Sequence, residues 1–300
     1  MALVATLVAN PSNPALSAAL GETAAAAVQA SGLYWLADGV ACDIALRDGT
    51  NPDAAEQRLR DAMAGAPIDV VVQDAETRRK RLLIADMDST MIGQECIDEL
   101  AAEVGLKDQV ALITARAMNG DIAFEPALIE RVRLLKGLPL SVVDDVIAKH
   151  ITLTPGGMEL IATMKAKGAY TALVSGGFTV FTGPIGNRLG FDENRANRLV
   201  VANGILDGTV EEPILGRQAK VDALIAIARR LGIDPQDAMA VGDGANDLGM
   251  IQLAGSGVAL HAKPAVAAEA RIRIDHGDLT ALLYIQGYRK TDFVSPADRP

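Results

Sequence analysis

The chain has 300 residues, which is enough for about two domains at roughly 150 residues each. Its net charge of −10 excludes the basic surface that binding to nucleic acid requires, so we expect no nucleic-acid partner. Half of the residues are hydrophobic and 22% are charged, a composition that excludes an intrinsically disordered chain.

The two cysteines, Cys42 and Cys96, are too few for a disulfide framework or a four-cysteine zinc site, so we expect a reducing compartment. The first nine residues are apolar, but no Lys or Arg precedes Arg47, and a signal peptide needs such a basic segment. No stretch approaches the roughly 18 apolar residues needed to cross a bilayer. We therefore expect a cytoplasmic protein without a membrane partner.

Hydrophobic patterns and turn signals predict the first elements in chain order: strand 3–8, helix 15–30, strands 34–37 and 41–46, helix 52–63 and strand 68–72. Asp38-Gly39 is a hairpin turn signal between the second and third strands. The order β-α-β-β-α-β predicts a ferredoxin-like α+β domain over residues 1–78. The basic run 75–81 that follows is either a linker or a solvated helix end.

The rest of the chain, 79–300, has strands that are apolar throughout, at 82–85, 170–174, 238–241 and 258–260, with helices that include 155–167 and 220–231. Such strands are typical of a parallel sheet covered on both faces. We predict a doubly wound α/β domain, whose ligands bind at the carboxyl ends of the strands. Residues 93–150 show no strand signal, so we expect a helical cap inserted over those ends.

Acidic residues follow two of these strands. Asp86 and Asp88 point to the same side of an extended backbone, and Asp243 and Asp247 follow the third strand. Four acids at one edge of a sheet repel each other unless a cation binds. Mg²⁺ suits the site because it takes hard oxygen ligands and is shared between carboxylates and a phosphate.

Two other interpretations of these acids fit the sequence less well. A calcium loop starting at Asp86 would need glycine at its sixth position and glutamate at its twelfth, where the chain has Met91 and Ile97. A dinucleotide fingerprint starting at Gly242 would place Asp247 where the third glycine belongs, and its charge would oppose a pyrophosphate. Any single Asp here is more often a turn or helix-cap residue.

Ser175-Gly176-Gly177 follows the second strand, and Lys220 begins the helix before the third. A hydroxyl followed by glycines can bring backbone N–H groups close to an anion, and the lysine adds a positive charge. Singly, Ser175 is more often a turn residue and Lys220 a surface lysine. Together with the acids at successive strand ends, they predict a phosphoryl-transfer site.

These residues resemble the four motifs of the haloacid dehalogenase superfamily, and more closely its phosphoserine phosphatase family. The resemblance runs from about Arg81 to Tyr288 and rests on these segments: 86–90, 175–178, Lys220, 242–247, Asn119-Gly120, Phe124, Arg131, 134–136 and 196–199. Met87 departs from it, because the family commonly has Phe there. The resemblance implies a doubly wound core with a helical cap at about 93–150.

The resemblance also implies roles. Asp86 would be the nucleophile that forms an aspartyl-phosphate, and Asp88 the general acid and then base. Phosphoryl oxygens would contact Ser175, Gly176, Gly177 and Lys220, while Asn246 would touch the substrate. One Mg²⁺ would bind Asp86, the carbonyl of Asp88, Asp243 and Asp247, the last acting also on a metal-bound water or on Lys220.

The cap would set specificity for O-phospho-L-serine, which the enzyme would convert to L-serine and phosphate in the last step of serine biosynthesis. Glu95 would pair with the substrate ammonium and Arg131 with its carboxylate, while Met118 and Phe124 would exclude water. Without the resemblance, Glu95 is equally well an exposed helix acid and Arg131 an ordinary basic residue. Cys96 has no base partner and is expected to be a small buried residue.

The N-terminal domain resembles an ACT-like domain by element order, which leaves dimerisation through it and binding of an amino-acid effector as hypotheses. Two rival functions remain. One is transfer of the phosphoryl group to another acceptor, or hydrolysis of another small phosphomonoester. The other is a non-catalytic amino-acid sensor, which the presence of all motif acids argues against.

Overall fold

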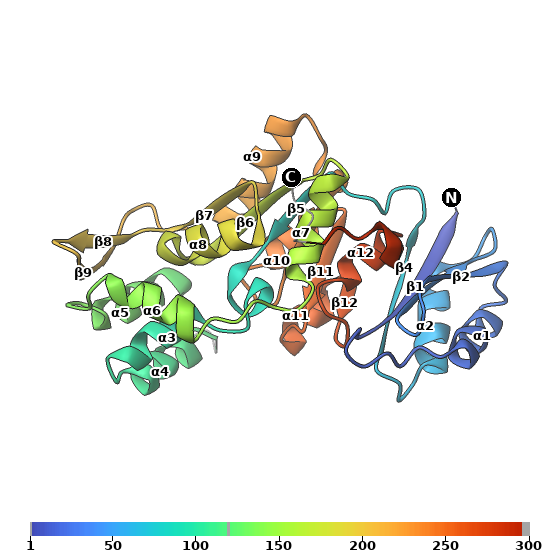
Figure 1. The fold of residues 1–300 in the computed structure, drawn as a ribbon, viewed down its shortest axis with the longest axis horizontal. Helices are drawn as coiled ribbons and strands as arrows, with labels where there is room; N and C mark the ends of the chain where they lie inside the picture. The colour runs from blue at the N-terminus through green and yellow to red at the C-terminus, as the bar shows by residue number, and fades with distance from the viewer. Residues whose placement is uncertain (1, 119–120, 296–300) are drawn as a thin grey trace.

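A computed structural model describes residues 2–118 and 121–295. The described residues form a four-stranded, a six-stranded and a two-stranded sheet. Figure 1 shows the four-stranded sheet at the N-terminal end of an elongated molecule and the two-stranded sheet at the opposite end, with the six-stranded sheet between them. The described residues contain no helix long and apolar enough to cross a membrane.

The N-terminal elements confirm the predicted order β-α-β-β-α-β: β1 (Leu3–Ala9), α1 (Ala18–Ala27), β2 (Gly32–Ala37), β3 (Ala41–Ala45), α2 (Pro52–Ala62) and β4 (Ile68–Asp74). The strands pair antiparallel in the order β2-β3-β1-β4. Helix α1 is shorter than predicted because Ser17 caps it, its hydroxyl accepting a hydrogen bond from the Leu20 N–H. The arrangement is compatible with an ACT-like domain.

The central sheet is parallel throughout, in the order β12-β11-β10-β5-β6-β7. Its strands are β5 (Leu82–Ala85), β6 (Tyr170–Phe178), β7 (Glu193–Asn197), β10 (Ala238–Gly242), β11 (Ser256–Leu260) and β12 (Ile272–Ile274). The four predicted strands are confirmed. Strands β7 and β12 are not predicted from the sequence; they lie at the edges of the sheet, where strands carry polar residues or are short.

Helices cover both faces of this sheet, as the doubly wound prediction requires: α7 (Gly157–Ala166), α8 (Thr179–Leu189), α9 (Arg217–Leu231), α10 (Leu248–Leu253), α11 (Pro264–Glu269) and α12 (Ala281–Ile285). Leu82 and Ile84 of β5 pack with α9 and α10, while Leu83 and Ala85 pack in the cluster that contains α7, α8 and α12. Single 3₁₀ turns occur at Pro235–Asp237 and Lys290–Asp292, whereas Met87–Met91 is a tight turn with non-helical backbone at Asp88 and Ser89.

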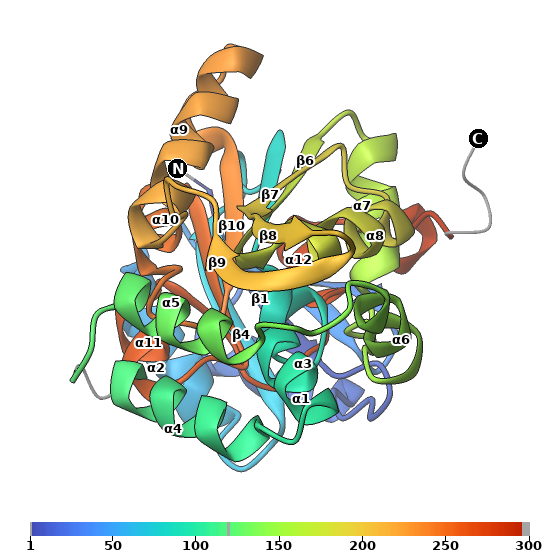
Figure 2. The same cartoon turned by 90° about the vertical axis from the view of Figure 1, so that its left-hand side faces the viewer.

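Four helices follow β5: α3 (Cys96–Glu103), α4 (Lys107–Met118), α5 (Phe124–Leu134) and α6 (Ser141–Lys149). Between residues 93 and 150, apart from the undescribed 119–120, no strand forms. A hairpin of β8 (Leu199–Ala202) and β9 (Ile205–Val210) is not among the predicted elements. It hydrogen-bonds to the loop between α5 and α6: the Gly137 N–H donates to the Leu206 carbonyl and the Leu140 N–H to the Gly204 carbonyl, each at 2.9 Å. Figures 1 and 2 both place this hairpin beside the cap helices.

The N-terminal sheet packs directly on the core. Val8 and Val71 share an apolar cluster with helix α12. The buried Asp69 carboxylate accepts hydrogen bonds from three successive backbone N–H groups, those of Asp275, His276 and Gly277. The run 75–81 is anchored rather than fully solvated, because Arg78 pairs with Asp43 at 2.7 Å and buried Lys80 donates to the Gln236 carbonyl.

Candidate active site

Three parallel strands end at the same edge of the central sheet and carry the predicted residues there. Strand β5 leads into Asp86, β10 leads into Asp243, and Ser175 lies in the C-terminal part of β6. After Asp86 the chain turns sharply, and Ser89 adopts a left-handed conformation with φ 54°. Asp88 lies within this turn, with extended backbone angles.

Asp86, Asp243 and Asp247 are buried and each offers an oxygen within 4.8 Å of the others, the one such group of potential metal ligands among the described residues. The Asp88 carboxylate lies outside this group. It accepts hydrogen bonds from the Cys96 N–H at 2.9 Å and the Ser175 hydroxyl at 3.2 Å. The three carboxylates predicted to bind the metal therefore lie together. The Asp88 side chain does not join them, which fits the resemblance, because it implies only the backbone carbonyl of Asp88 as a ligand.

Lys220 is buried, with 2% of its surface exposed, and its Nζ lies 2.6 Å from Oδ1 of both Asp86 and Asp247. The contact to Asp247 is a hydrogen bond, whereas Asp86 Oδ1 is a buried oxygen that receives no hydrogen bond of good geometry. Three carboxylates around one ammonium leave a negative charge. Three buried carboxylates that meet in this way fit a bound divalent cation, since buried charges need a partner.

The pKa shifts of these acids also indicate a site whose negative charge needs a cation to balance it. Burial and the charge of Asp247 raise the pKa of Asp86 well above the usual carboxyl value, although Lys220 lowers it. Burial and Asp247 also raise the pKa of Asp243 to about 6, against the hydrogen bond that the Thr90 hydroxyl donates to it at 3.2 Å. A cation bound here would favour the ionised forms of these groups.

The loop Ser175-Gly176-Gly177 requires its two glycines for steric reasons. A Cβ on Gly177 would lie 2.8 Å from Asp88 Oδ2, and a Cβ on Gly176 would lie 3.0 Å from the ring of Phe124. The Ser175 hydroxyl accepts a hydrogen bond from the Gly177 N–H at 2.8 Å. The same Gly176 Cβ would approach the Asn246 amide at 3.9 Å, so Asn246 also faces this loop.

Two cap residues predicted to bind substrate lie in this part of the molecule. Ser89 donates a hydrogen bond to Glu95 at 2.8 Å, and burial of the carboxylate together with the charge of Asp88 raises the pKa of Glu95 to about 7. Part of the Glu95 side chain remains exposed, so water reaches it. Arg131 is buried and donates to the Thr114 hydroxyl and the Ala127 carbonyl, each at 3.2 Å.

Phe124 begins helix α5 and packs over the glycine loop from the cap side, because a Cβ on Gly176 or Gly216 would touch its ring. Met118 ends helix α4, but its side chain and the segment Asn119-Gly120 lie outside the described residues. Cys96 is 1% exposed, and burial beside Asp88 raises its thiol pKa above the usual value, which agrees with an unreactive buried residue.

Two polar residues near the site were missed as functional candidates. Asp98 lies one helical turn after Glu95, and its buried Oδ1 has no hydrogen-bond partner, while its charge raises the pKa of Arg131 against the lowering caused by burial. Asn197 hydrogen-bonds to Gly176 and Leu215. Asp98 could have been found from its i+3 spacing to Glu95, and Asn197 from its place in the segment 196–199.

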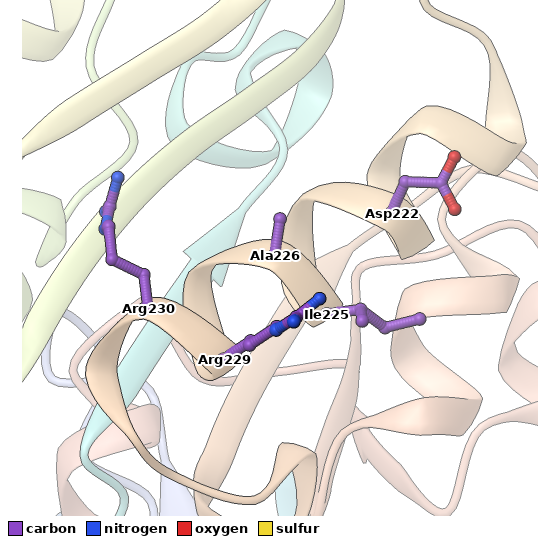
Figure 3. A pocket seen from close by; sticks show the side chains of 5 residues that line it. All are labelled: Asp222, Ile225, Ala226, Arg229 and Arg230. Atoms are coloured by element: carbon purple, nitrogen blue, oxygen red, sulfur yellow. The ribbon is translucent and has the colours of Figure 1, made fainter.

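A shallow hollow lies elsewhere, on the outer surface of helix α9 (Figure 3). It is lined by Asp222, Ile225, Ala226, Arg229 and Arg230, all from this one helix. The Arg230 guanidinium stacks over the ring of Tyr170, the first residue of β6, so the hollow extends toward the end of the sheet opposite the acids. It takes no part in the candidate site.

Known proteins are similar to this chain in both sequence and fold. A sequence model of the haloacid dehalogenase-like hydrolase family matches residues 83–252. A protein of Archaeoglobus fulgidus named phosphoserine phosphatase is 44% identical over 234 residues, which is 77% of this chain and 68% of that protein. A solved structure described as a phospho-aspartyl intermediate analogue of phosphoserine phosphatase is 44% identical, with a TM-score of 0.64, covering 69% of this chain and 98% of that one.

The likeness extends beyond the catalytic core. The crystal structure of a HAD family hydrolase from Salmonella enterica serovar Typhi is 29% identical and has a TM-score of 0.83. It covers 95% of this chain and 98% of that chain, so the shared fold includes most of the N-terminal sheet.

Proposed function

The chain belongs to the haloacid dehalogenase-like hydrolase family, and from that membership we propose that it hydrolyses O-phospho-L-serine to L-serine and phosphate, the last step of serine biosynthesis. The observation that carries the proposal is the meeting of Asp86, Lys220 and the Ser175 loop under cap residues Glu95 and Arg131. The first group suits phosphoryl transfer, and the second suits an amino-acid leaving group.

The proposed cofactor is one Mg²⁺, held by Asp86, the Asp88 carbonyl, Asp243 and Asp247. The cation would cancel the repulsion between the nucleophilic carboxylate and the phosphate ester. Its support is the set of ligands itself, three buried carboxylates whose hard oxygens lie within 4.8 Å of one another. The cytoplasmic location stays a prediction.

In the proposed reaction an Asp86 oxygen bonds to phosphorus as the bond from phosphorus to the serine oxygen breaks. Asp88 protonates that leaving oxygen, and it then accepts a proton from the water that cleaves the aspartyl-phosphate. Burial raises the pKa of Asp88 above the usual carboxyl value, which favours a proton at the start, although the Cys96 N–H and Ser175 hydroxyl stabilise the ionised form.

The phosphoryl oxygens would be held by the Ser175 hydroxyl, by N–H groups of Gly176 and Gly177 and by Lys220, with Asn246 touching the substrate. These donors face the place where charge is concentrated in phosphoryl transfer. The serine part would lie under the cap. Glu95 would pair with its ammonium, Arg131 with its carboxylate, and Phe124 and Met118 would exclude water.

The test is a panel of phosphomonoesters assayed with and without Mg²⁺. We expect phosphate release from O-phosphoserine that needs Mg²⁺ and is absent in Asp86→Asn. After rapid acid quench, labelled phosphate should be attached to Asp86. Turnover that survives thorough chelation, or label on another residue, would contradict the mechanism. A strong preference for an ester without amino and carboxylate groups would contradict the substrate.

We also propose domains at 1–78 and 79–300, with the cap at about 93–150 and an ACT-like role for the N-terminal domain in dimerisation or effector binding. One face of its sheet packs on the core, which leaves the edge strand β2 and helices α1 and α2 for another subunit. Light scattering of the purified chain tests the dimer, and phosphatase assays with added L-serine test the effector.

A further inference from the structure

The carboxamide of Asn197 joins two separate pieces of the site. Asn197 ends strand β7 and is buried, with 2% of its surface exposed. Its Nδ2 donates to the Gly176 carbonyl at 2.8 Å and to the Leu215 carbonyl at 3.2 Å, and its Oδ1 accepts from the Leu215 N–H at 2.7 Å. All three partners are backbone groups, so they are present whatever side chains surround them.

The first partner explains how the glycine loop is held. Val174 pairs with Arg195 and Phe178 pairs with Asn197, so four steps along β6 match two along β7. The segment 175–177 therefore bulges out of the ladder, and the Gly176 carbonyl loses a strand partner. The Asn197 amide supplies the missing donor and fixes this peptide, because a buried carbonyl needs a hydrogen bond.

The second partner lies at the entry to helix α9. Leu215 precedes Gly216, the residue that caps α9, and Lys220 is in the first turns of that helix. Asn197 bonds both backbone groups of Leu215, so it fixes the direction from which the chain enters α9. Lys220 in turn contacts Asp86 and Asp247. One buried side chain thus connects the glycine loop to the helix that carries the lysine.

The chain between Asn197 and Leu215 makes the β8–β9 hairpin, which hydrogen-bonds to the cap loop 137–140. Asn197 and Leu215 are the two ends of this excursion, and the carboxamide closes it at its base. Figure 1 shows the hairpin reaching from the sheet toward the cap helices. The base of the cap-contacting hairpin and the glycine loop are therefore held by the same group.

We propose that Asn197 is a positioning residue for phosphoryl binding: it holds the Gly176 peptide and the start of α9 in register, so that the loop donors and Lys220 converge on one phosphoryl group. The inference rests on the proposed function for the identity of that subsite. Because the phosphoryl group is common to all phosphomonoesters, loss of Asn197 affects every ester, unlike loss of Glu95 or Arg131.

The test compares Asn197→Asp with the wild-type chain. The variant keeps the shape of the side chain and the acceptor for Leu215, but it replaces the donor with an oxygen that faces two carbonyls. We expect kcat/KM to fall about 100-fold for both O-phosphoserine and p-nitrophenyl phosphate, as for other angstrom-scale displacements of catalytic groups. The inhibition constant for orthovanadate, which reports phosphoryl binding without turnover, should rise at least tenfold.

The matched control is Thr182→Val. The Thr182 hydroxyl is buried and donates to Asn194 of the same strand at 2.8 Å, without contacting the glycine loop. It should lower the melting temperature and leave kcat/KM and vanadate inhibition within twofold of the wild type. Asn197→Ser, which adds no charge and leaves room for water, serves if Asn197→Asp does not fold, and should show the same pattern.

A folded Asn197 variant with kcat/KM within twofold of the wild type would overturn the inference. So would a loss confined to O-phosphoserine, or an unchanged vanadate constant. If the wild-type chain cleaves p-nitrophenyl phosphate but not O-phosphoserine, the proposed substrate fails while these comparisons still decide the role of Asn197.

Discussion

Replacing Lys220 with Met tests whether the buried lysine holds the acidic cluster together. The substitution keeps much of the side-chain volume and removes the charge that lies 2.6 Å from both Asp86 and Asp247. Removing one partner of a buried ion pair costs about 3–5 kcal/mol, because the remaining charge is left uncompensated. At about 2–4 °C per kcal/mol for a domain of this size, the melting temperature should fall by roughly 6–20 °C in EDTA.

The loss should depend on pH in a defined direction. Burial and Asp247 already raise the pKa of Asp86, and Lys220 is the group that lowers it, so the pKa rises further in Lys220→Met. A carboxyl whose pKa is higher in the folded than in the unfolded state stabilises the fold at low pH and loses this contribution as pH rises through the folded pKa. Lys220 itself has its pKa raised above 10.5, so its contribution in the wild type is constant between pH 5 and 8.

The assay is thermal unfolding of the wild type and Lys220→Met at pH 5 and pH 8, in EDTA. The difference between the two proteins should be larger at pH 8. The double variant Lys220→Met/Asp247→Asn should recover part of the lost stability, because it removes one of the buried negative charges left without a partner. A melting temperature within 2 °C of the wild type at both pH values would refute the reasoning, and so would a larger difference at pH 5.

Three further predictions concern other parts of the molecule. Glu95→Leu and Arg131→Leu should each raise KM for O-phosphoserine at least tenfold more than KM for p-nitrophenyl phosphate, and equal losses would count against recognition of the amino acid by the cap. Gly242→Ala should lower kcat at least 100-fold, since its Cβ would collide with the Asp247 carboxylate. An unchanged kcat in steady-state assays of the folded variant would show that the position of Asp247 is not needed for catalysis. Asp69→Ala should lower the melting temperature by several degrees, because the loop after β12 loses the acceptor of its backbone N–H groups, while kcat stays within threefold. An unchanged melting temperature would argue against a tight contact between the N-terminal sheet and the core.

Local sequence was sufficient for the parts of the fold whose signal is local. The strands β5, β6, β10 and β11 are apolar runs, and the first three of these runs end at Asp, Ser or Gly, so the sequence predicts a buried parallel sheet with its ligand site at the strand ends. The motif acids could be placed at one edge for the same reason. The polar strand β7 and the short β12 were missed because their stability comes from pairing with strands distant in the chain. The β8–β9 hairpin is local, and its Asn203-Gly204 turn is a hairpin signal that could have predicted it.

The amino-acid sequence by itself determined which chemical groups stand at the ends of the strands, since continuous apolar runs and the polar residues that follow them are neighbours in the chain. Only the tertiary structure decided how those groups meet: that Lys220 is buried between Asp86 and Asp247, that the Asp88 carboxylate accepts hydrogen bonds from Cys96 and Ser175, and that an asparagine joins the glycine loop to α9. Such contacts join residues far apart in the chain, and burial and charge act across them only after packing has brought the segments together.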